Sequence, residues 1–185
     1  MLAINFSLRA HTWVSRGSLL LFSGLLAFWV TNAVARTHIS TQEFLTQHFD
    51  EHIPSPKILW LTNELQRKAT DLLDHPPHTM RLRYWQQGTK VAWVINEIGK
   101  EQPITFGIVV QDHKIESIQV LAFRESRGGE IRYPAYSQQF NGVKLTTNHR
   151  LDKEIDGITG ATLSVRAMQR VARLALFASS VVADS

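Results

Sequence analysis

The 185-residue sequence contains no cysteine. Disulfide bonds, thiol redox chemistry, iron–sulfur ligation by cysteine and covalent c-type haem attachment are therefore excluded. The sequence also lacks a carboxylate pair or a histidine–nucleophile arrangement that would carry acid–base or covalent catalysis, and it shows no internal repeat or low-complexity tract. Any redox function would therefore need a cofactor that binds without cysteine.

A large excess of basic charge is missing as well. The formal net charge is +4, from 20 Lys and Arg against 16 Asp and Glu. Arg9 and Arg16 lie in the first 35 residues, which hold no acid, so the rest of the chain carries 18 basic against 16 acidic residues, a net charge of +2. Such a balance does not support nucleic-acid binding. With 44% hydrophobic residues the chain can bury a core, and its length suits one domain plus a leader.

Residues 1–35 have the pattern of an export signal. The basic residues precede an uncharged, mostly apolar run over 18–30, and Ala33-Val34-Ala35 follows with the small-residue pattern of a signal-peptidase site. The run is shorter than the ~20 residues of a transmembrane helix. With residues 31–35 included it could still serve as an uncleaved anchor. We expect cleavage, and either outcome places the rest of the chain in the periplasm, soluble or anchored in the inner membrane.

Residues 36–78 are predicted to form an N-terminal helical segment. A short helix is expected over 40–52, where Ser40 and Glu43 fit a capping box. A second helix is expected over 57–74, because apolar residues recur there at helical spacing.

Two histidine pairs lie in this segment, His48 with His52 and His75 with His78. The first pair is interpreted as part of a solvated helix face, since no third ligand follows at a diagnostic spacing. The second pair is interpreted as part of a loop. We therefore predict no metal site.

Residues 79–185 are predicted to form the main domain, with an α+β fold. Four β-forming segments follow one another, at 80–85, 91–95, 104–110 and 114–123. Short connections, such as the two residues Asp112-His113, imply an antiparallel meander of about four strands packed with helices. In the last strand either alternate set could face the core: Ile115, Ser117, Gln119, Leu121 and Phe123, or Ile118, Val120 and Ala122.

A C-terminal helix is expected from about Leu163 to Ala178, with an apolar face toward the sheet. Arg166, Arg170 and Arg173 line another face of this helix. They are interpreted as a solvated stripe, with docking to an acidic redox partner as the alternative.

A polar, glycine-rich turn precedes this helix and runs directly into it. The turn reads Asp156-Gly157-Ile158-Thr159-Gly160-Ala161-Thr162, and Leu163-Ser164 follow. Thr162 lies where a helix cap is expected, because a threonine oxygen can accept a hydrogen bond from an amide of the first turn. Free amides at such a helix end favour a phosphate group. The pattern fits a plain capped helix, or a hydroxyl nucleophile beside an anion site.

The segment Asp156–Thr162 resembles the flavinylation motif of the FMN-binding domain family. That family includes the flavin-carrying subunits of the sodium-translocating NADH:quinone reductase and of the Rnf electron-transport complex. In it, a flavin transferase moves FMN from FAD onto the last threonine of the motif and releases AMP. The resemblance covers roughly residues 79–178 and implies FMN on Thr162. It implies these cofactor-binding residues: Asp156, Gly157, Thr159, Gly160, Ala161, Thr162, Leu163 and Ser164.

A second informative segment, 124–142, is charged and glycine-rich at its start and aromatic toward its end. Taken alone it is typical of a surface loop. The resemblance implies that it lies beside the flavin, which adds Glu125, Arg127 and Gly128 to the cofactor-binding residues. Better-known respiratory members have Glu-Thr-Pro-Gly where this chain has Glu125-Ser126-Arg127-Gly128.

Together these features predict an exported FMN carrier that passes electrons between redox partners, more a carrier or subunit than a stand-alone enzyme. The flavin supplies the chemistry in such a protein, and the chain supplies attachment and orientation. The implied partners are a flavin transferase and redox proteins, membrane-bound or cytochrome, with membrane association possible through residues 18–35. Two alternatives stay open: an FMN-dependent extracytoplasmic reductase component acting on a small acceptor, and a non-redox binding module that has kept the fold.

Overall fold

The computed structural model describes residues 39–50 and 52–183. The expected export signal, 1–35, lies outside these residues. None of the helices in the described ranges is both long enough and apolar enough to cross a membrane.

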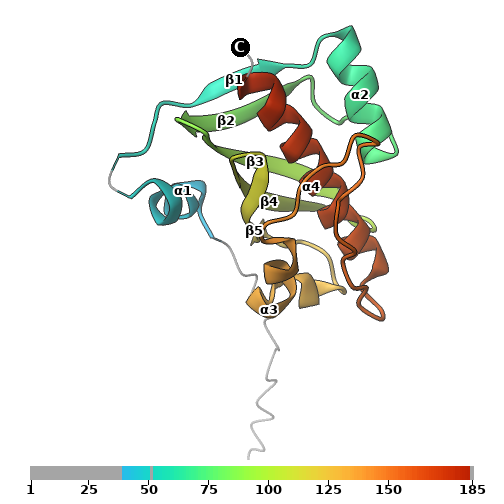
Figure 1. The fold of residues 1–185 in the computed structure, drawn as a ribbon. Helices are drawn as coiled ribbons and strands as arrows, with labels where there is room; N and C mark the ends of the chain where they lie inside the picture. The colour runs from blue at the N-terminus through green and yellow to red at the C-terminus, as the bar shows by residue number, and fades with distance from the viewer. Residues whose placement is uncertain (1–38, 51, 184–185) are drawn as a thin grey trace, which may run out of the picture. The chain divides into compact units, whose positions relative to one another are not determined.

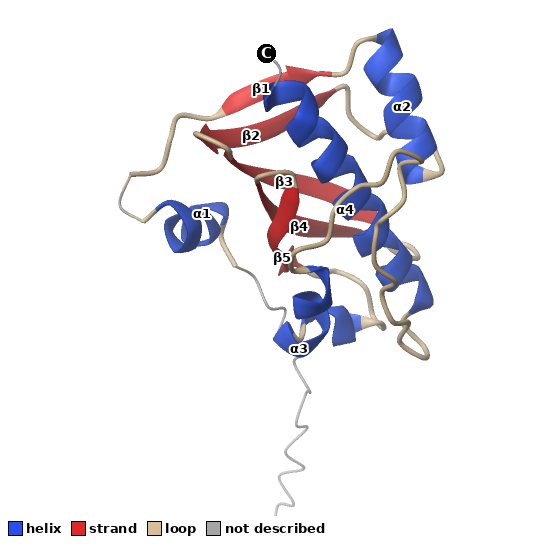
Figure 2. Ribbon diagram, viewed as in Figure 1, coloured by secondary structure: helices blue, strands red, loops and turns tan. Residues whose placement is uncertain are grey.

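A five-stranded antiparallel sheet forms the centre of the described structure, with the strands in sequence order (Figures 1 and 2). The strands are β1 (Lys57–Trp60), β2 (Arg81–Gln87), β3 (Lys90–Ile98), β4 (Pro103–Gln111) and β5 (Lys114–Ala122). The predicted α+β fold with an antiparallel meander is confirmed, with one strand more than expected. The hairpin at Asp112-His113 is the predicted two-residue turn, and both residues have positive φ, 49° and 61°.

The additional strand lies at the start of the segment predicted as a helix over 57–74. That prediction is wrong for its first residues, because Lys57–Trp60 pairs with Arg81–Tyr84 along the sheet edge. The helix there, α2 (Asn63–Leu73), begins only after Thr62. Ile58 matched the helical spacing of the later apolar residues by coincidence. Pairing with β2 overrides that spacing, and the β-branched and aromatic residues of this stretch favour it.

Helices cover both faces of the sheet. On one face lie α2 and the long C-terminal helix α4 (Thr162–Ala183), and on the other lies α1 (Thr41–Phe49). Residues of β4 alternate between the two: Ile104, Phe106, Ile108 and Val110 face α4, whereas Val109 packs with Phe44 of α1. Ser40 caps α1 as predicted, since its side-chain oxygen accepts a hydrogen bond from the Glu43 amide at 3.0 Å.

Strand β5 follows neither of the two alternating patterns along its whole length. Its register against β4 shifts once at Glu116 and again at Leu121. The first shift places Ile115 on the same face as Ile118 and Val120, toward α4. After the second shift Phe123 lies on that face as well, although Leu121, two residues before it, faces α1. A bulge adds one residue to one strand of a pair, so it changes which side chains face the core.

Helix α4 is longer than predicted, with 22 residues in place of the stretch 163–178. It crosses the sheet and packs on β3, β4 and β5 and also on α2 (Figure 1). A buried hydrogen bond of 2.8 Å from the Trp93 indole nitrogen to the Ser179 hydroxyl joins β3 to its C-terminal half.

The connection from β5 to α4 starts as the expected loop and then folds into short helical turns. These are η1 (Gly129–Arg132), α3 (Pro134–Ser137) and η2 (Gln138–Phe140). Ile131 and Phe140 are fully buried, and Tyr136 is nearly so. The prediction of a plain surface loop over 124–142 is therefore wrong for its second half, because these apolar side chains anchor it to the core.

Candidate functional site

The glycine-rich motif leads into the first turn of α4. The Ala161 carbonyl accepts the hydrogen bond of the Val165 amide at 3.0 Å, so Ala161 occupies the N-cap and Thr162 is the first helical residue. The prediction of Thr162 as the cap is wrong by one position. As a consequence, the Thr162 amide is itself one of the free donors at this helix end.

Three backbone amides point out of this first turn. Within the described part of the chain, the amides of Thr162, Leu163 and Ser164 donate to no protein acceptor. Thr162 is exposed and Leu163 is 42% exposed, whereas Ala161 and Ser164 are buried. The exposed Thr162 hydroxyl thus lies beside unpartnered donors and the positive end of the helix dipole. This arrangement fits a phosphate group esterified to threonine.

The turn before Thr162 is tight but open to solvent. Its closing hydrogen bond joins the Ala161 amide to the Ile158 carbonyl at 3.0 Å, and Ile158 packs partly against the core. Gly160 has φ +84°, a conformation that side chains rarely adopt, yet no atom lies within 4 Å of where a Cβ would be. Gly157 also borders open space, and Thr159 is exposed. The protein leaves room around these residues for a bound group.

Gly128 is distant from the motif in sequence but packs against it in the fold. It has φ +80° and is buried, and a Cβ there would lie 2.6 Å from the Ser164 hydroxyl oxygen and 3.4 Å from the Ala161 Cα. Only glycine permits this contact without displacement. The structure thus brings Gly128 against the first turn of α4, and the exposed Arg127 precedes it in the same loop.

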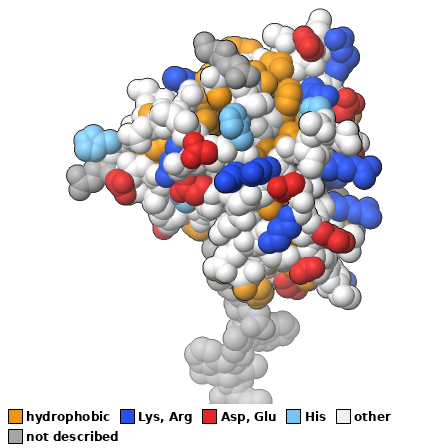
Figure 3. Space-filling view, viewed as in Figure 1, with side chains coloured by type: hydrophobic (Ala, Val, Ile, Leu, Met, Phe, Trp, Pro, Cys, Tyr) orange, Lys and Arg blue, Asp and Glu red, His pale blue; other side chains and the backbone are white. Residues whose placement is uncertain are grey.

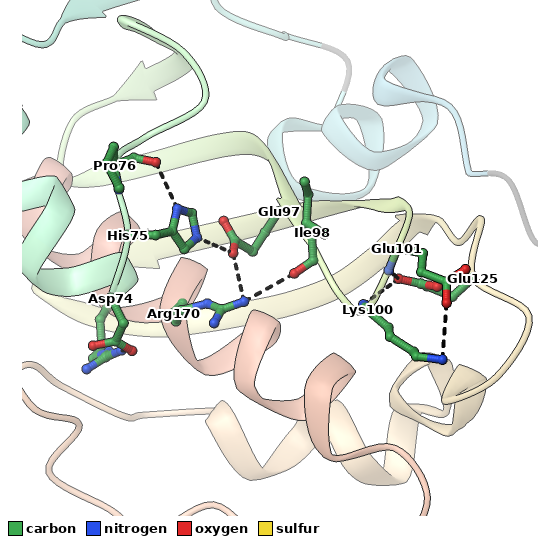
Figure 4. A network of polar contacts seen from close by, with 10 residues as sticks. Asp74, His75, Pro76, Glu97, Ile98, Lys100, Glu101, Glu125 and Arg170 are labelled. Atoms are coloured by element: carbon green, nitrogen blue, oxygen red, sulfur yellow. Dashed lines mark hydrogen bonds and ion pairs between the residues drawn. The ribbon is translucent and has the colours of Figure 1, made fainter.

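Glu125 has a different position. Its Oε1 accepts hydrogen bonds from the backbone amides of Lys100, Glu101 and Gln102, at 2.5, 2.7 and 2.9 Å, in the turn between β3 and β4. Figure 4 shows Glu125 beside Lys100 and Glu101. Burial by itself would raise the pKa of Glu125, but these three amides and the Lys100 charge lower it below its ordinary value. The carboxylate therefore fixes the start of the loop that carries Gly128.

The first residue of the motif is held through its backbone. The Tyr136 hydroxyl donates to the Asp156 carbonyl at 3.2 Å, and the Gln139 side-chain oxygen accepts from the Asp156 amide at 3.0 Å. Burial and the Asp156 charge raise the pKa of Tyr136 to about 12, so its hydroxyl stays protonated and can donate. Neither Tyr136 nor Gln139 is among the site residues predicted from the sequence. The aromatic character of the later part of 124–142 is the signal that points to Tyr136.

The arginines of α4 are not a uniform solvated stripe. Arg170 lies 2.9 Å from Oε1 of Glu97, which is 1% exposed, and donates to the Ile98 carbonyl at 3.1 Å (Figure 4). Arg173 pairs with Asp74 at 3.0 Å. The prediction of a solvated stripe is wrong for these two residues, because β3 and the end of α2 supply carboxylates that sequence spacing could not reveal. Arg166 is exposed.

Charges of both signs are mixed on the face seen in Figure 3, where Lys and Arg side chains lie among Asp and Glu. Of the first histidine pair, His52 is exposed as predicted, but His48 differs from its prediction. His48 packs its ring against Phe44 and has only 13% of its side chain exposed, so it is no part of a solvated face.

Comparison with known proteins identifies the domain. Residues 99–176 match the FMN-binding domain family, from the turn after β3 into α4, and no curated protein matches the chain. The matched range contains Glu125, Gly128 and the complete motif up to Thr162. This match confirms the resemblance and supports an FMN-binding flavoprotein.

Proposed function

We propose that this protein is an exported electron-transfer flavoprotein whose FMN is attached through its phosphate to Thr162. One observation carries the proposal: within the FMN-binding domain, the exposed Thr162 side chain lies beside three amides without protein partners. A phosphate bound there meets hydrogen-bond donors and a favourable helix dipole, worth roughly a kcal/mol or less at an exposed helix end.

The attachment is a phosphoryl transfer and changes no oxidation state. The Thr162 Oγ forms a bond to the phosphorus of the FMN half of FAD, the bond from that phosphorus to the AMP oxygen breaks, and the hydroxyl proton leaves to solvent. A flavin transferase is the partner that this step requires. The chain itself contributes an accessible hydroxyl and the donors of the Leu163 and Ser164 amides.

The bound flavin supplies one- and two-electron chemistry. The exposure of Thr162 and Leu163 allows a redox protein to approach the flavin, which favours a carrier over an enzyme with a closed substrate pocket. A reductase component acting on a small acceptor is the alternative, and steady turnover with such an acceptor would favour it. A non-redox module is excluded if the purified protein is yellow and bleaches on reduction.

Export through residues 1–35 is part of the proposal and is supported by the basic start, the apolar run and the Ala-x-Ala pattern of the sequence. N-terminal sequencing of the periplasmic fraction should then find Arg36 as the first residue. A full-length chain in the cytosol would contradict export.

The attachment is tested by co-expressing the full chain with an active flavin transferase. The wild-type chain should fluoresce on a denaturing gel and gain the mass of one FMN less one water. Thr162→Ala should lose this gain completely and remain folded. Thr159→Ala, also exposed and in the same turn, is the matched control and should keep it. Retention of the mass gain in Thr162→Ala would refute the attachment site.

A further inference from the structure

A second group of chemically active side chains lies beside the middle of α4. His75 and His78 come from the loop after α2, and Glu97 comes from β3. Figure 4 shows His75 and Glu97 side by side. One ligand atom of each of the three residues lies within 4.8 Å of the others. They border a cavity of about 490 Å³ that is open to solvent and is also lined by Pro76, Gly99 and Arg170. The proposed flavin attachment uses none of these residues.

The hydrogen bonds of His75 determine which of its nitrogens is free. Its Nδ1 lies 2.8 Å from the Pro76 carbonyl oxygen, which can only accept, so Nδ1 carries a hydrogen. In the neutral ring Nε2 then has a lone pair, and Nε2 lies 2.7 Å from Oε1 of Glu97, which is also an acceptor. Two electron-pair donors that face each other this closely require a positive charge between or beside them.

Glu97 has one oxygen that is not used by its protein partners. The ion pairs with His75 and Arg170 both use Oε1, and no described residue bonds to Oε2. In Figure 4 this second oxygen lies on the side away from Arg170. Although Glu97 as a whole is 1% exposed, Oε2 is not among the buried atoms without a partner, so this oxygen borders solvent, where a cation or water can reach it.

We propose that His75, His78 and Glu97 form a binding site for a divalent metal ion such as zinc. Two imidazoles and one carboxylate are a ligand set that zinc accepts, and the cavity leaves a fourth position for water. The hydrogen bond from Nδ1 to the Pro76 carbonyl is the outer contact that typically orients a metal-binding histidine. A bound ion would tie the loop after α2 to β3.

A proton on Nε2 is the competing explanation for the short contact. Burial lowers the pKa of His75, but the hydrogen bond to Glu97 and the Pro76 carbonyl outweigh it, and the pKa is raised overall. An imidazolium would then pair with Glu97 and Arg170 without any metal. The two explanations differ in the role of His78, which is exposed and is needed only by the metal.

The test uses the full chain without a polyhistidine tag, after treatment with a chelator. Titration with zinc chloride in a calorimeter should show one ion per chain, and cobalt chloride should give the absorption bands of a four-coordinate site. His78→Ala should weaken zinc binding at least tenfold, as expected for loss of a ligand. Because His78 is exposed, this variant should fold normally. His52→Ala, which removes another exposed histidine, is the matched control and should bind as the wild type does.

The metal site would be overturned if the wild type did not bind zinc, or if His78→Ala bound zinc as tightly as the wild type. A proton on Nε2 of His75 would then explain the short contact with Glu97. The test is independent of the flavin, because Thr162→Ala should bind zinc with unchanged affinity. Failure of flavin attachment and failure of metal binding are therefore distinguishable.

Discussion

The first turn of α4 is exposed to solvent, whereas the middle of the same helix is bound to the sheet. At the first turn Thr162 and Leu163 are exposed, and the amides have no protein partners. Two turns further on, Arg170 bonds to a carboxylate that is 1% exposed and to a strand carbonyl. One end of the helix is open to another molecule, and the middle is fixed to the sheet.

This difference suits the proposed modification of Thr162 by a flavin transferase. A transferase can reach a threonine only if it is exposed, but the position of an exposed residue is reproducible only if the element carrying it is held elsewhere. Here the middle of α4 holds the helix, and Gly128, Tyr136 and Gln139 hold the turn before it. The helix therefore presents Thr162 in a defined place without covering it.

The largest effect is expected when the middle of the helix is disrupted. Arg170→Met removes the guanidinium beside Glu97 and leaves a buried carboxylate with only His75, so the free energy of unfolding should fall by about 3 kcal/mol. Arg166→Met, on the exposed side of the same helix, should change it by less than about 0.5 kcal/mol. Urea unfolding of both variants measures the difference. Equal stabilities would show that the middle does not anchor the helix.

The next effect concerns the contact between the loop and the first turn. Gly128→Ala combines a strained positive φ with a Cβ placed 2.6 Å from the Ser164 hydroxyl. We therefore expect the free energy of unfolding to fall by about 2 kcal/mol and FMN loading to be reduced. Adding Ser164→Ala removes the hydroxyl and should recover part of the stability, but not the part due to φ. Thermal unfolding and intact mass measure the two effects. Full stability in Gly128→Ala would contradict the close approach.

A smaller effect separates the two glycines of the motif. Gly160→Ala should lower the free energy of unfolding by about 1 kcal/mol because φ at this position is +84°, although no atom lies within 4 Å of the added Cβ. Gly157→Ala has open space and no such φ, so its stability should stay within about 0.5 kcal/mol of the wild type. If Gly157→Ala nevertheless loses FMN loading, the transferase needs close access to this backbone. Equal stability losses in both variants would contradict the role of φ at Gly160.

The sequence predicted the fold class, the hairpin at Asp112-His113 and the position of the motif, because each depends on local patterns. It missed β1, where pairing with a strand more than 20 residues away decided the structure. It could not resolve the core face of β5, because a bulge leaves no reliable local signal.

In the candidate site, too, features that depend on local sequence could be predicted, whereas contacts between distant segments could not. Thr162 could be predicted as the attachment site because its motif is contiguous in the chain, and this assignment stays a prediction. The contact of Gly128 with Ser164, the hydrogen bonds to Asp156 and the pair of Arg170 with Glu97 are contacts between distant segments, so no spacing rule could predict them. The single-position error at Thr162 also has a physical cause, since a threonine fits both the N-cap and the first helical position and the turn geometry decides between them.

The smallest effect is a pH dependence at Glu125, which anchors the loop that meets the open end of the helix. The amides of residues 100–102 and the Lys100 charge outweigh burial and lower the pKa of Glu125 when the chain is folded, so the unfolded chain binds the proton more tightly. The stabilisation is therefore fully present above the ordinary pKa of 4.5 and is lost as the pH falls through the lower folded value.

In Glu125→Gln the three amides lose a charged acceptor, so at pH 7 the variant should be less stable by roughly 1 kcal/mol. Thermal unfolding of both proteins between pH 7 and pH 3 should show this difference shrinking below the ordinary pKa. A difference that stays constant over that range would mean that the Glu125 charge does not hold the loop. Arg127→Gln, in the same loop and exposed, should show no such change with pH.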